Sequence, residues 1–570
     1  MVFPYLSSPD GSEIEAALCR FDFPWLTSHI GRRLEEGDDP ELRHVLGLLQ
    51  QFSGDPALVP VADRNLQRAY QALRARGEPR KAALVAVSLG RLHHDGIGDQ
   101  PVGNGWLARA FSLVEAEEPC VEQGWVLLGL VGCNVTDTAR LFSDAERALQ
   151  LARHFGDVEL ECKALADSGL ALVSLGRISD GMARLDQAMV MLRSGECPGP
   201  MVGSAVVCDL LSACERASDL PRAEAWLSIL EELGAVQPPD RQPSFLFTHC
   251  RLAYGSVLCE MGRWTQAEVA LRLSTSLAMR HGRSNRVASA AALADLLVQQ
   301  GRLDAAAALL EGNDDRIEAL TPLARLHLAR RKPDLAAAVA RQGLRLLGGD
   351  QLRAARLRAV LVEAELGARR IEAAEDAATR LEDAAAASEL PGVSALAAQA
   401  RGRIAVQRGD TAEARRHFEA ALAALHGGGW PLLQGTLHLE LARLESMADR
   451  SAAIAEASAA LAIFQRIDSP SADRAAALLE GMGQNVRVAR PPVTPLDVLS
   501  RREREVFDLL ALGMSNPAIA QRLFITPKTA EHHVSSILSK LGLRSRAEVA
   551  AFAGALNAAP PATRQVASAS

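Results

Sequence analysis

Residues 499–506 are Leu-Ser-Arg-Arg-Glu-Arg-Glu-Val, and two further stretches follow: Gly-Met-Ser-Asn-Pro-Ala-Ile-Ala at 513–520 and Thr-Pro-Lys-Thr-Ala-Glu-His-His at 526–533. Ser500 with Glu503 predicts a capping box, in which each side chain satisfies an amide group at the start of a helix. Thr526 followed by Pro527 predicts another helix start. The pattern predicts four short helices, and the third begins only a few residues after the second ends. Two helices joined so closely must cross steeply, which is the condition for a helix-turn-helix.

Apolar residues recur at helical spacing through the second and third of these helices, and we expect them to form the core of the motif. The expected core residues are Ile519, Ala520, Leu523, Ala530, Val534 and Ile537. His533 is an alternative to Val534 at its inward position. Asn516 is expected to cap the second helix, and Ser545 with Glu548 predicts a second capping box at the start of the fourth helix.

The C-terminal motif is basic although the chain is acidic. Residues 499–553 contain eight Lys and Arg against five Asp and Glu, a net charge of +3, whereas the whole chain carries −7. The rest of the chain therefore sums to −10. A small basic unit joined to an acidic body is typical of a DNA-binding module tethered to a domain that does not touch phosphate.

The same block, over about residues 495–555, resembles the DNA-binding domain of the LuxR family of bacterial transcription regulators. The positions that match in order and spacing are Arg502, Glu503, Val506, Gly513, Ser515, Asn516, Ile519, Ala520, Leu523, Thr529, His533, Lys540, Leu541, Ser545 and Arg546. The resemblance implies that three residues of the third helix face base edges in the major groove, namely Glu531, His532 and Ser535. It also implies phosphate contacts by Lys528, Thr529, Arg544 and Arg546.

Three positions depart from the usual family pattern. Pro517 and Ala530 stand where Lys and Val are common, and they suit a helix start and a small core residue. Glu531 stands at a position that is often basic. A carboxylate there can accept a hydrogen bond from cytosine N4, but it repels phosphate. The alternative is an exposed Glu531 that pairs with Lys528 three residues earlier.

From about residue 80 to 465 the chain repeats one pattern: an Ala- and Leu-rich helix, a short turn that is often Gly-Arg, and a second helix. Turns are expected at residues 176, 218, 262, 301, 331, 368 and 409, which lie 30 to 44 residues apart. In three repeats an Ala follows the turn Gly by five residues, at Ala267, Ala306 and Ala414. Paired helices with a period of about 40 predict an α-solenoid, and the array resembles tetratricopeptide repeats. Such an array presents a long concave surface to a partner, a ligand or another copy of the chain.

The composition agrees with an all-α chain, since aromatic residues make up only 4% and Ala, Leu and Arg dominate. We expect an α-solenoid of tetratricopeptide-like helical hairpins followed by a four-helix LuxR-type helix-turn-helix domain. The expected divisions are an N-terminal helical segment at 1–60, the repeat array at 61–480, a linker at 481–494, the DNA-binding domain at 495–557 and a disordered tail at 558–570. Within the N-terminal segment, helices are expected near residues 13–20 and 41–51.

Patterns for other chemistries are weak. The chain has no Gly-Lys dipeptide, which excludes a phosphate-binding loop of the G-x-x-x-x-G-K type, and no run of apolar strands could build a phosphorylatable receiver domain. Its nine cysteines include no C-x-x-C pair. His93, His94 and Asp95 are the nearest candidates for a metal or acid–base site, but adjacent histidines on one turn rarely converge on a metal. We therefore expect no enzyme activity, no catalytic residues, no metal site and no cofactor.

These features predict a bacterial transcription regulator that binds double-stranded promoter or operator DNA. Its repeats are expected to sense a protein, peptide or small-molecule effector or to drive self-association, and a homodimer is expected because one such domain has a small footprint on DNA. The absence of a signal-peptide pattern and of a long uncharged apolar stretch predicts a cytoplasmic protein with no membrane partner. The alternative is a repeat scaffold for protein–protein interaction whose DNA-binding domain is inactive or autoinhibited.

Overall fold

The computed structural model describes residues 11–19, 22–53, 55–129, 137–226, 244–278, 283–347, 349–426, 429–446, 448–486, 495–523 and 525–557. Within these ranges the chain is helical and contains no β-strand, so the expected all-α class is confirmed. The predicted tail and residues 487–494 of the predicted linker lie outside the described residues.

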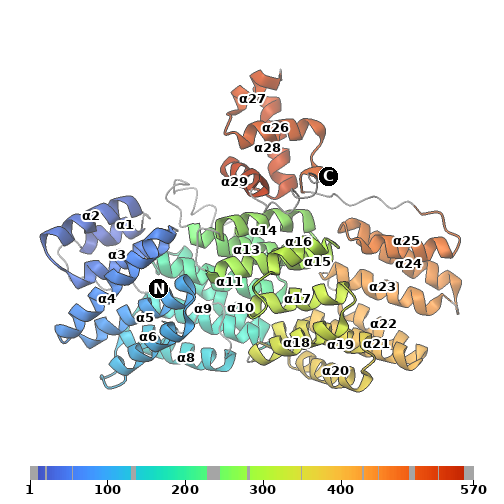
Figure 1. Cartoon of the computed structure of the whole chain (residues 1–570), viewed down its shortest axis with the longest axis horizontal. Coiled ribbons are helices and arrows are strands. Elements are labelled where there is room, and N and C mark those ends of the chain that lie inside the picture. Colours follow the sequence, from blue (N-terminus) through green and yellow to red (C-terminus); the bar gives the residue numbers. More distant parts are fainter. Residues whose placement is uncertain are drawn as a thin grey trace, which may run out of the picture.

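Figure 1 shows helices stacked side by side from the N-terminal end, with a small helical domain resting on the stack. The helices of the first part are α1 (Gly11–Cys19), α2 (Phe23–Glu36), α3 (Pro40–Phe52), α4 (Val59–Ala75), α5 (Pro79–Arg91), α6 (Gln100–Val114), α7 (Val121–Gly129), α8 (Thr138–Phe155), α9 (Val158–Ser174), α10 (Ile178–Arg193) and α11 (Pro200–Ala217). Two short elements lie among them, η1 (Pro56–Leu58) and the π-helix η2 (Leu92–Ile97).

The later helices of the stack are α13 (Ser244–Glu260), α14 (Trp264–Ala278), α15 (Arg283–Gln299), α16 (Leu303–Leu310), α17 (Ile317–Ala329), α18 (Pro333–Leu346), α19 (Gln351–Gly367), α20 (Ile371–Ala386), α21 (Pro391–Arg408), α22 (Thr411–Ala424), α23 (Pro431–Glu445), α24 (Arg450–Arg466) and α25 (Ser471–Gly481). The C-terminal domain contains η4 (Pro495–Val498), α26 (Arg501–Ala511), α27 (Asn516–Leu523), α28 (Pro527–Leu541) and α29 (Arg546–Asn557).

Consecutive helices of the stack form hairpins. Pairs such as α9 with α10, α13 with α14 and α23 with α24 pack against each other, and each odd-numbered helix from α5 to α19 also contacts the next odd-numbered helix. The odd-numbered helices therefore form one layer against which the even-numbered helices pack, which is the geometry of an α-solenoid. Buried apolar side chains between the helices form one cluster that extends from Leu84 to Ala475. The expected solenoid of tetratricopeptide-like hairpins is confirmed.

Backbone conformation marks the turn of each repeat. Positive φ angles occur at Gly176 (92°), Ser218 (56°), Gly262 (76°), Gly301 (74°), Arg331 (57°), Arg369 (59°) and Gly409 (80°). All seven expected turns are therefore present, the sixth at Arg369 beside Ala368. Ala267, Ala306 and Ala414 are fully buried, as expected where the second helix of a hairpin approaches the first.

Arg369 offers a test of backbone strain at these turns. It is exposed, and its φ of 59° is a left-handed conformation that costs a residue with a Cβ atom about 1 kcal/mol relative to Gly. We expect Arg369→Gly to raise the free energy of unfolding of its repeat by about 1 kcal/mol, measured by hydrogen exchange in α19 and α20. Arg370→Gly is the control, because Arg370 has a φ of −103° and pairs with Glu365 and Asp334. The control is expected to lower stability, and effects of the same sign at both positions would contradict the explanation.

The array curls until segments far apart in the sequence touch. η2 contacts α15, and α19 contacts both α9 and α11. At the turn after α9, the Glu389 N–H donates to the Gly176 carbonyl oxygen at 3.2 Å, and the Glu389 carboxylate accepts from the Ser179 N–H at 2.8 Å. Gly176 permits this approach, since an added Cβ atom would lie 2.9 Å from the Ala387 carbonyl oxygen.

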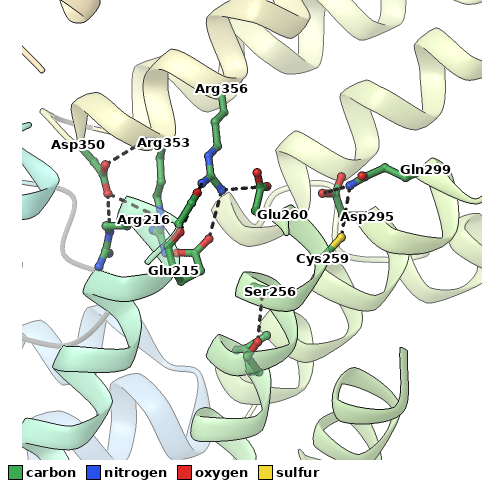
Figure 2. Close-up of polar contacts among 12 residues, drawn as sticks. Glu215, Arg216, Ser256, Cys259, Glu260, Asp295, Gln299, Asp350, Arg353 and Arg356 are labelled. Carbon is green, nitrogen blue, oxygen red and sulfur yellow. Dashed lines mark hydrogen bonds and ion pairs between the residues drawn. The ribbon is translucent and has the colours of Figure 1, made fainter. Parts of the chain in front are cut away.

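Ion pairs join the distant segments between α11, α13 and α19 (Figure 2). The Arg216 guanidinium lies 3.2 Å from the Asp350 carboxylate, and only 6% and 5% of these side chains are exposed. The Arg356 guanidinium lies 3.4 Å from the Glu215 carboxylate and 3.3 Å from that of Glu260. A long open concave surface was expected from the sequence. The chain's own side chains occupy part of that surface here.

Among the described residues of the first sixty, α2 and the short η1 were not predicted from the sequence. α1 and α3 lie near the two expected ranges, whereas α2 was not expected. α2 begins after Asp22, whose carboxylate accepts from the Trp25 N–H at 3.4 Å, and it buries Leu26 and Ile30. α3 packs against α4, across the division predicted between residues 60 and 61.

Candidate nucleic-acid interface

The C-terminal helices begin at capping side chains. At α26 the Ser500 hydroxyl accepts from the Glu503 N–H at 3.3 Å, and the Glu503 carboxylate accepts from the Ser500 N–H at 2.7 Å. At α28 the Thr526 hydroxyl accepts from the Thr529 N–H at 3.1 Å. The four expected helices and the first capping box are therefore present, which follows from side-chain chemistry local to each helix start.

One expected cap was wrong, and another was confirmed in part. α27 begins at Asn516, and the hydroxyl of the preceding Ser515 accepts from the Ala518 N–H at 3.4 Å, so Ser515 takes the place expected for Asn516. At α29 the Ser545 hydroxyl accepts from the Glu548 N–H at 3.3 Å, as expected, whereas the Glu548 carboxylate accepts from the Arg544 N–H at 2.8 Å and not from the Ser545 N–H. At both helix starts neighbouring residues offer equally suitable groups, and only the path of the turn selects between them.

Six residues were expected to form the core of this domain. Five of them are buried in its apolar cluster: Ile519, Ala520, Ala530, Val534 and Ile537. Leu523 packs against the cluster and is half-buried. His533 is also half-buried, so Val534 takes the inward position. The rings of Phe507 and Phe552 meet edge to face with centroids 6.3 Å apart and join α26 to α29.

Glu503 links α26 to α28 across the domain. Its buried carboxylate accepts from the Ser536 hydroxyl at 2.6 Å and from the Lys540 ammonium at 2.7 and 2.8 Å. Burial raises the pKa of this carboxyl, but the hydrogen bonds from Lys540, Ser536 and Ser500 outweigh burial and lower the pKa to about 2. The sequence indicated only the capping role of Glu503. The contact with Lys540, 37 residues later, fixes α28 relative to α26.

One face of α28 is exposed over its N-terminal turns. Lys528, Glu531, His532 and Ser535 are all exposed, and their spacing of three or four residues places them on one side of the helix. Among the described residues, Glu531 and Lys528 form no ion pair with each other or with another side chain. The expected alternative, in which Glu531 pairs with Lys528, is therefore not seen. The three residues expected to read bases lie together.

The four residues expected to contact phosphate lie in different surroundings. Lys528 is exposed beside the base-reading residues, whereas the half-buried Thr529 shares a hydrogen bond of 2.8 Å with the Thr526 hydroxyl. Arg546 is exposed but donates to the Asn516 side-chain oxygen at 3.0 Å. The Arg544 guanidinium lies 5.4 Å from the centre of the Tyr254 ring of α13, outside the domain. In this arrangement Lys528 extends toward solvent, and the other three are engaged by protein groups.

Residues 497–553 match the family model of bacterial regulatory proteins of the luxR family. These residues form a LuxR-type DNA-binding domain. Over 79 residues the chain is 43% identical to the probable transcriptional regulatory protein NarL of Mycobacterium tuberculosis. The aligned segment covers 14% of this chain and 36% of that protein. Over 59 residues it is 44% identical to the oxygen regulatory protein NreC of Staphylococcus aureus, covering 10% of this chain and 27% of NreC. The chain therefore spans about a third or less of the length of these relatives.

Two solved structures overlap most of the chain at low similarity. One is the APC/C hetero-tetramer Cut9–Hcn1, with a TM-score of 0.36, 13% identity, and coverage of 84% of this chain and 98% of that chain. The other is the human IFIT1 dimer with PPP-AAAA, with a TM-score of 0.37, 11% identity, and coverage of 83% and 90%. Overlap at this level supports no conclusion about the arrangement or function of the repeats in this chain.

The described residues offer little support for a metal or acid–base site. His93, singled out in the sequence, lies in η2 with its Nε2 atom 3.1 Å from the Asp63 carboxylate. Across the described residues, no three or more His, Cys, Asp or Glu side chains are arranged to hold a metal ion. No helix in the described part of the chain is long and apolar enough to cross a bilayer.

Proposed function

We propose that the chain is a bacterial transcription regulator that binds double-stranded promoter or operator DNA as a cytoplasmic homodimer. The observation that carries the proposal is the exposed face of α28 formed by Lys528, Glu531, His532 and Ser535 on a LuxR-type domain. An α-helix fits the major groove, and side chains on its N-terminal turns reach base edges there. The similar proteins from M. tuberculosis and S. aureus are themselves described as regulatory proteins, which supports the same role here.

Each residue of this face has a distinct part in the proposal. The Glu531 carboxylate accepts a hydrogen bond from cytosine N4, and Ser535 and His532 contact neighbouring base edges. Lys528 and, from the edges of the face, Thr529 and Arg546 contact phosphate and fix the register of the helix, and Arg544 does so when its guanidinium is free of Tyr254. The domain is small, so two copies on neighbouring half-sites supply the affinity that one copy lacks.

The repeats are proposed to receive the signal, from a protein, peptide or small-molecule effector, or to hold two copies together. A small pocket with room for about one water molecule lies between α3, α5, α7 and α9. Trp125 and Gln51 line this pocket, and among the described residues the indole N–H and the amide oxygen of these side chains have no hydrogen-bond partner. Unpaired polar groups at a pocket of this size favour an ordered water that completes their hydrogen bonds.

A selection from a random DNA library with the full-length protein, near physiological salt, tests the proposal. We expect enrichment of one motif. The matched control is the double variant Lys528→Glu/Ser535→Asp, which changes two exposed side chains and leaves the core intact, and it is expected to enrich no motif. If the wild-type protein enriches no motif, the scaffold with an inactive or autoinhibited DNA-binding domain is the better account.

Single substitutions on α28 separate phosphate contacts from base contacts. We expect Lys528→Ala to weaken binding about equally on all sequences and to reduce the slope of log K against log salt concentration by about 0.9. Ser535→Ala is expected to leave that slope unchanged and to alter base preference at one position. Fluorescence anisotropy with matched and mismatched duplexes at several salt concentrations measures both. Equal loss on every duplex for Ser535→Ala would rule out its base-reading role.

A further inference from the structure

The LuxR-type domain rests on α13 and α14 of the array (Figure 1). α14 contacts α29, α28 and η4, and its Val269 side chain is 1% exposed. Val269 belongs to the apolar cluster of the DNA-binding domain, so the array contributes one residue to that domain's core. We use the term docking face for the surface formed by Arg251, Tyr254, Gln266 and Val269.

Polar contacts make the docking specific. Arg251 forms an ion pair with Glu548 of α29, and only 8% and 18% of these side chains are exposed. Removal of either partner leaves a poorly solvated charge, so the pair favours one docked geometry. The Gln266 side-chain amide donates to the Ser539 carbonyl oxygen at 3.4 Å, at the end of α28.

The docked domain keeps its base-reading face uncovered. Among the described residues, the Gln266 side chain of the docking face approaches α28 and its cap at Ser539 and Gly542. Ser535 lies four residues before Ser539, about 6 Å along the helix axis, and Lys528 lies about 17 Å before it. Both are exposed, as are Glu531 and His532. A helix that enters the major groove with its N-terminal turns can therefore do so from this position.

Docking engages one residue of the expected DNA-binding surface. The Arg544 guanidinium stacks over the Tyr254 ring at 5.4 Å and is half-buried, and stacking of this kind stabilises a cation at an interface. Stacking holds this guanidinium at the interface with the array, so its position is set by Tyr254 and not by DNA. The docked domain is therefore expected to make one phosphate contact fewer than a released domain.

We propose that the DNA-binding domain binds DNA while it remains in contact with the docking face, and that Tyr254 keeps Arg544 from contacting phosphate in this docked form. This inference rests on the proposed function and adds to it. It assigns the array a positioning role, since a fixed orientation of α28 on each copy sets the spacing of two half-sites. Loss of the docking contacts frees Arg544 and increases affinity on all sequences.

A disulfide across the docking face provides the test. A Cβ atom at Gly542 would lie 3.3 Å from the Gln266 Cβ atom, close to the spacing of about 3.5–4.5 Å in disulfides. The full-length Gln266→Cys/Gly542→Cys variant is compared in oxidised and reduced form with the wild-type protein and the two single variants under the same treatment. Binding is measured on a duplex with the selected motif and on a random-sequence duplex of equal length.

We expect the oxidised, locked form to bind the selected duplex within a factor of about three of the reduced form. Binding that falls more than about a hundredfold on oxidation and returns on reduction would show that docking inhibits, and would overturn the inference while leaving the proposed function in place. Failure of the cysteines to cross-link would contradict the docked geometry. If neither form nor the wild-type protein binds either duplex, both the inference and the proposed function fail.

A double-mutant cycle on Tyr254 and Arg544 tests, without a cross-link, whether Tyr254 keeps Arg544 from contacting phosphate. In the wild-type background, Arg544→Ala is expected to leave the salt slope unchanged. Tyr254→Ala is expected to increase the magnitude of the slope of log K against log salt concentration by about 0.9. Addition of Arg544→Ala to the Tyr254→Ala variant is expected to remove this increase. A full loss of about 0.9 from Arg544→Ala alone would show that Arg544 contacts phosphate in the docked form, and would overturn its withholding by Tyr254.

Discussion

Replacement of Lys163 by Met is expected to lower the free energy of unfolding of the repeats around α9 by about 3–5 kcal/mol. Lys163 of α9 pairs with Asp167 of the same helix and lies 2.9 Å from the carboxylate of Asp209 on α11, and no more than 6% of any of the three side chains is exposed. Burial disfavours the charged carboxyl and raises the pKa of Asp167 to about 7. Removal of the ammonium leaves two buried carboxyl groups without their shared cation.

Hydrogen exchange in α9 and α11 measures the loss region by region, which suits a repeat protein whose units unfold partly independently. The control is the triple variant Lys163→Met/Asp167→Leu/Asp209→Leu, which replaces the whole ionic group by apolar side chains. It is expected to recover much of the stability, because an apolar set of similar volume avoids the cost of burying charge. Unchanged protection in Lys163→Met would mean that water reaches the carboxylates.

Replacement of Glu503 by Ala is expected to destabilise the DNA-binding domain by about 2–4 kcal/mol, because it removes a cap and the charge-assisted hydrogen bonds from Ser536 and Lys540. A domain of this size seldom has more than about 3–5 kcal/mol of stability of its own. DNA binding is therefore expected to fall together with the protection of α26 and α28 from hydrogen exchange. Glu505→Ala is the matched control, since Glu505 pairs with Arg502 at the surface and contributes little.

The same carboxyl makes the domain sensitive to acid. Glu503 has a pKa of about 2 in the folded chain, below the ordinary value of 4.5, so its stabilising effect is fully present above the ordinary value. The effect is lost as the pH falls toward 2, because the unfolded chain then binds a proton that the folded chain does not. In the wild-type protein, protection of α28 is expected to decline over this range more steeply than in Glu503→Ala. Parallel pH profiles would argue against the Glu503–Lys540 contact.

Local sequence decided the helices, their caps and their turns. Ser500 with Glu503 and Thr526 with Pro527 start helices through contacts that span three residues, which a pattern of neighbouring residues reveals. The repeat turns were found for the same reason, even at Ser218, where a residue other than Gly takes a positive φ of 56°. The exposed face of α28 followed from helical periodicity, which fixes the residues that lie on one side. α2 was missed because Pro24 near its start is as typical of a turn as of the first turn of a helix.

Tertiary structure alone decided how these helices meet. Arg216 and Asp350 are 134 residues apart, Ser179 and Glu389 are 210 apart, and Arg251 and Glu548 are 297 apart. No local pattern distinguishes these side chains from the many other charged residues that remain at the surface. The curl of the array sums small rotations from each repeat, and side-chain packing sets each rotation. The sequence by itself determined that a helical array carries a LuxR-type domain, whereas the closed curl and the docked position of that domain depend on complementary surfaces that exist only in the folded chain.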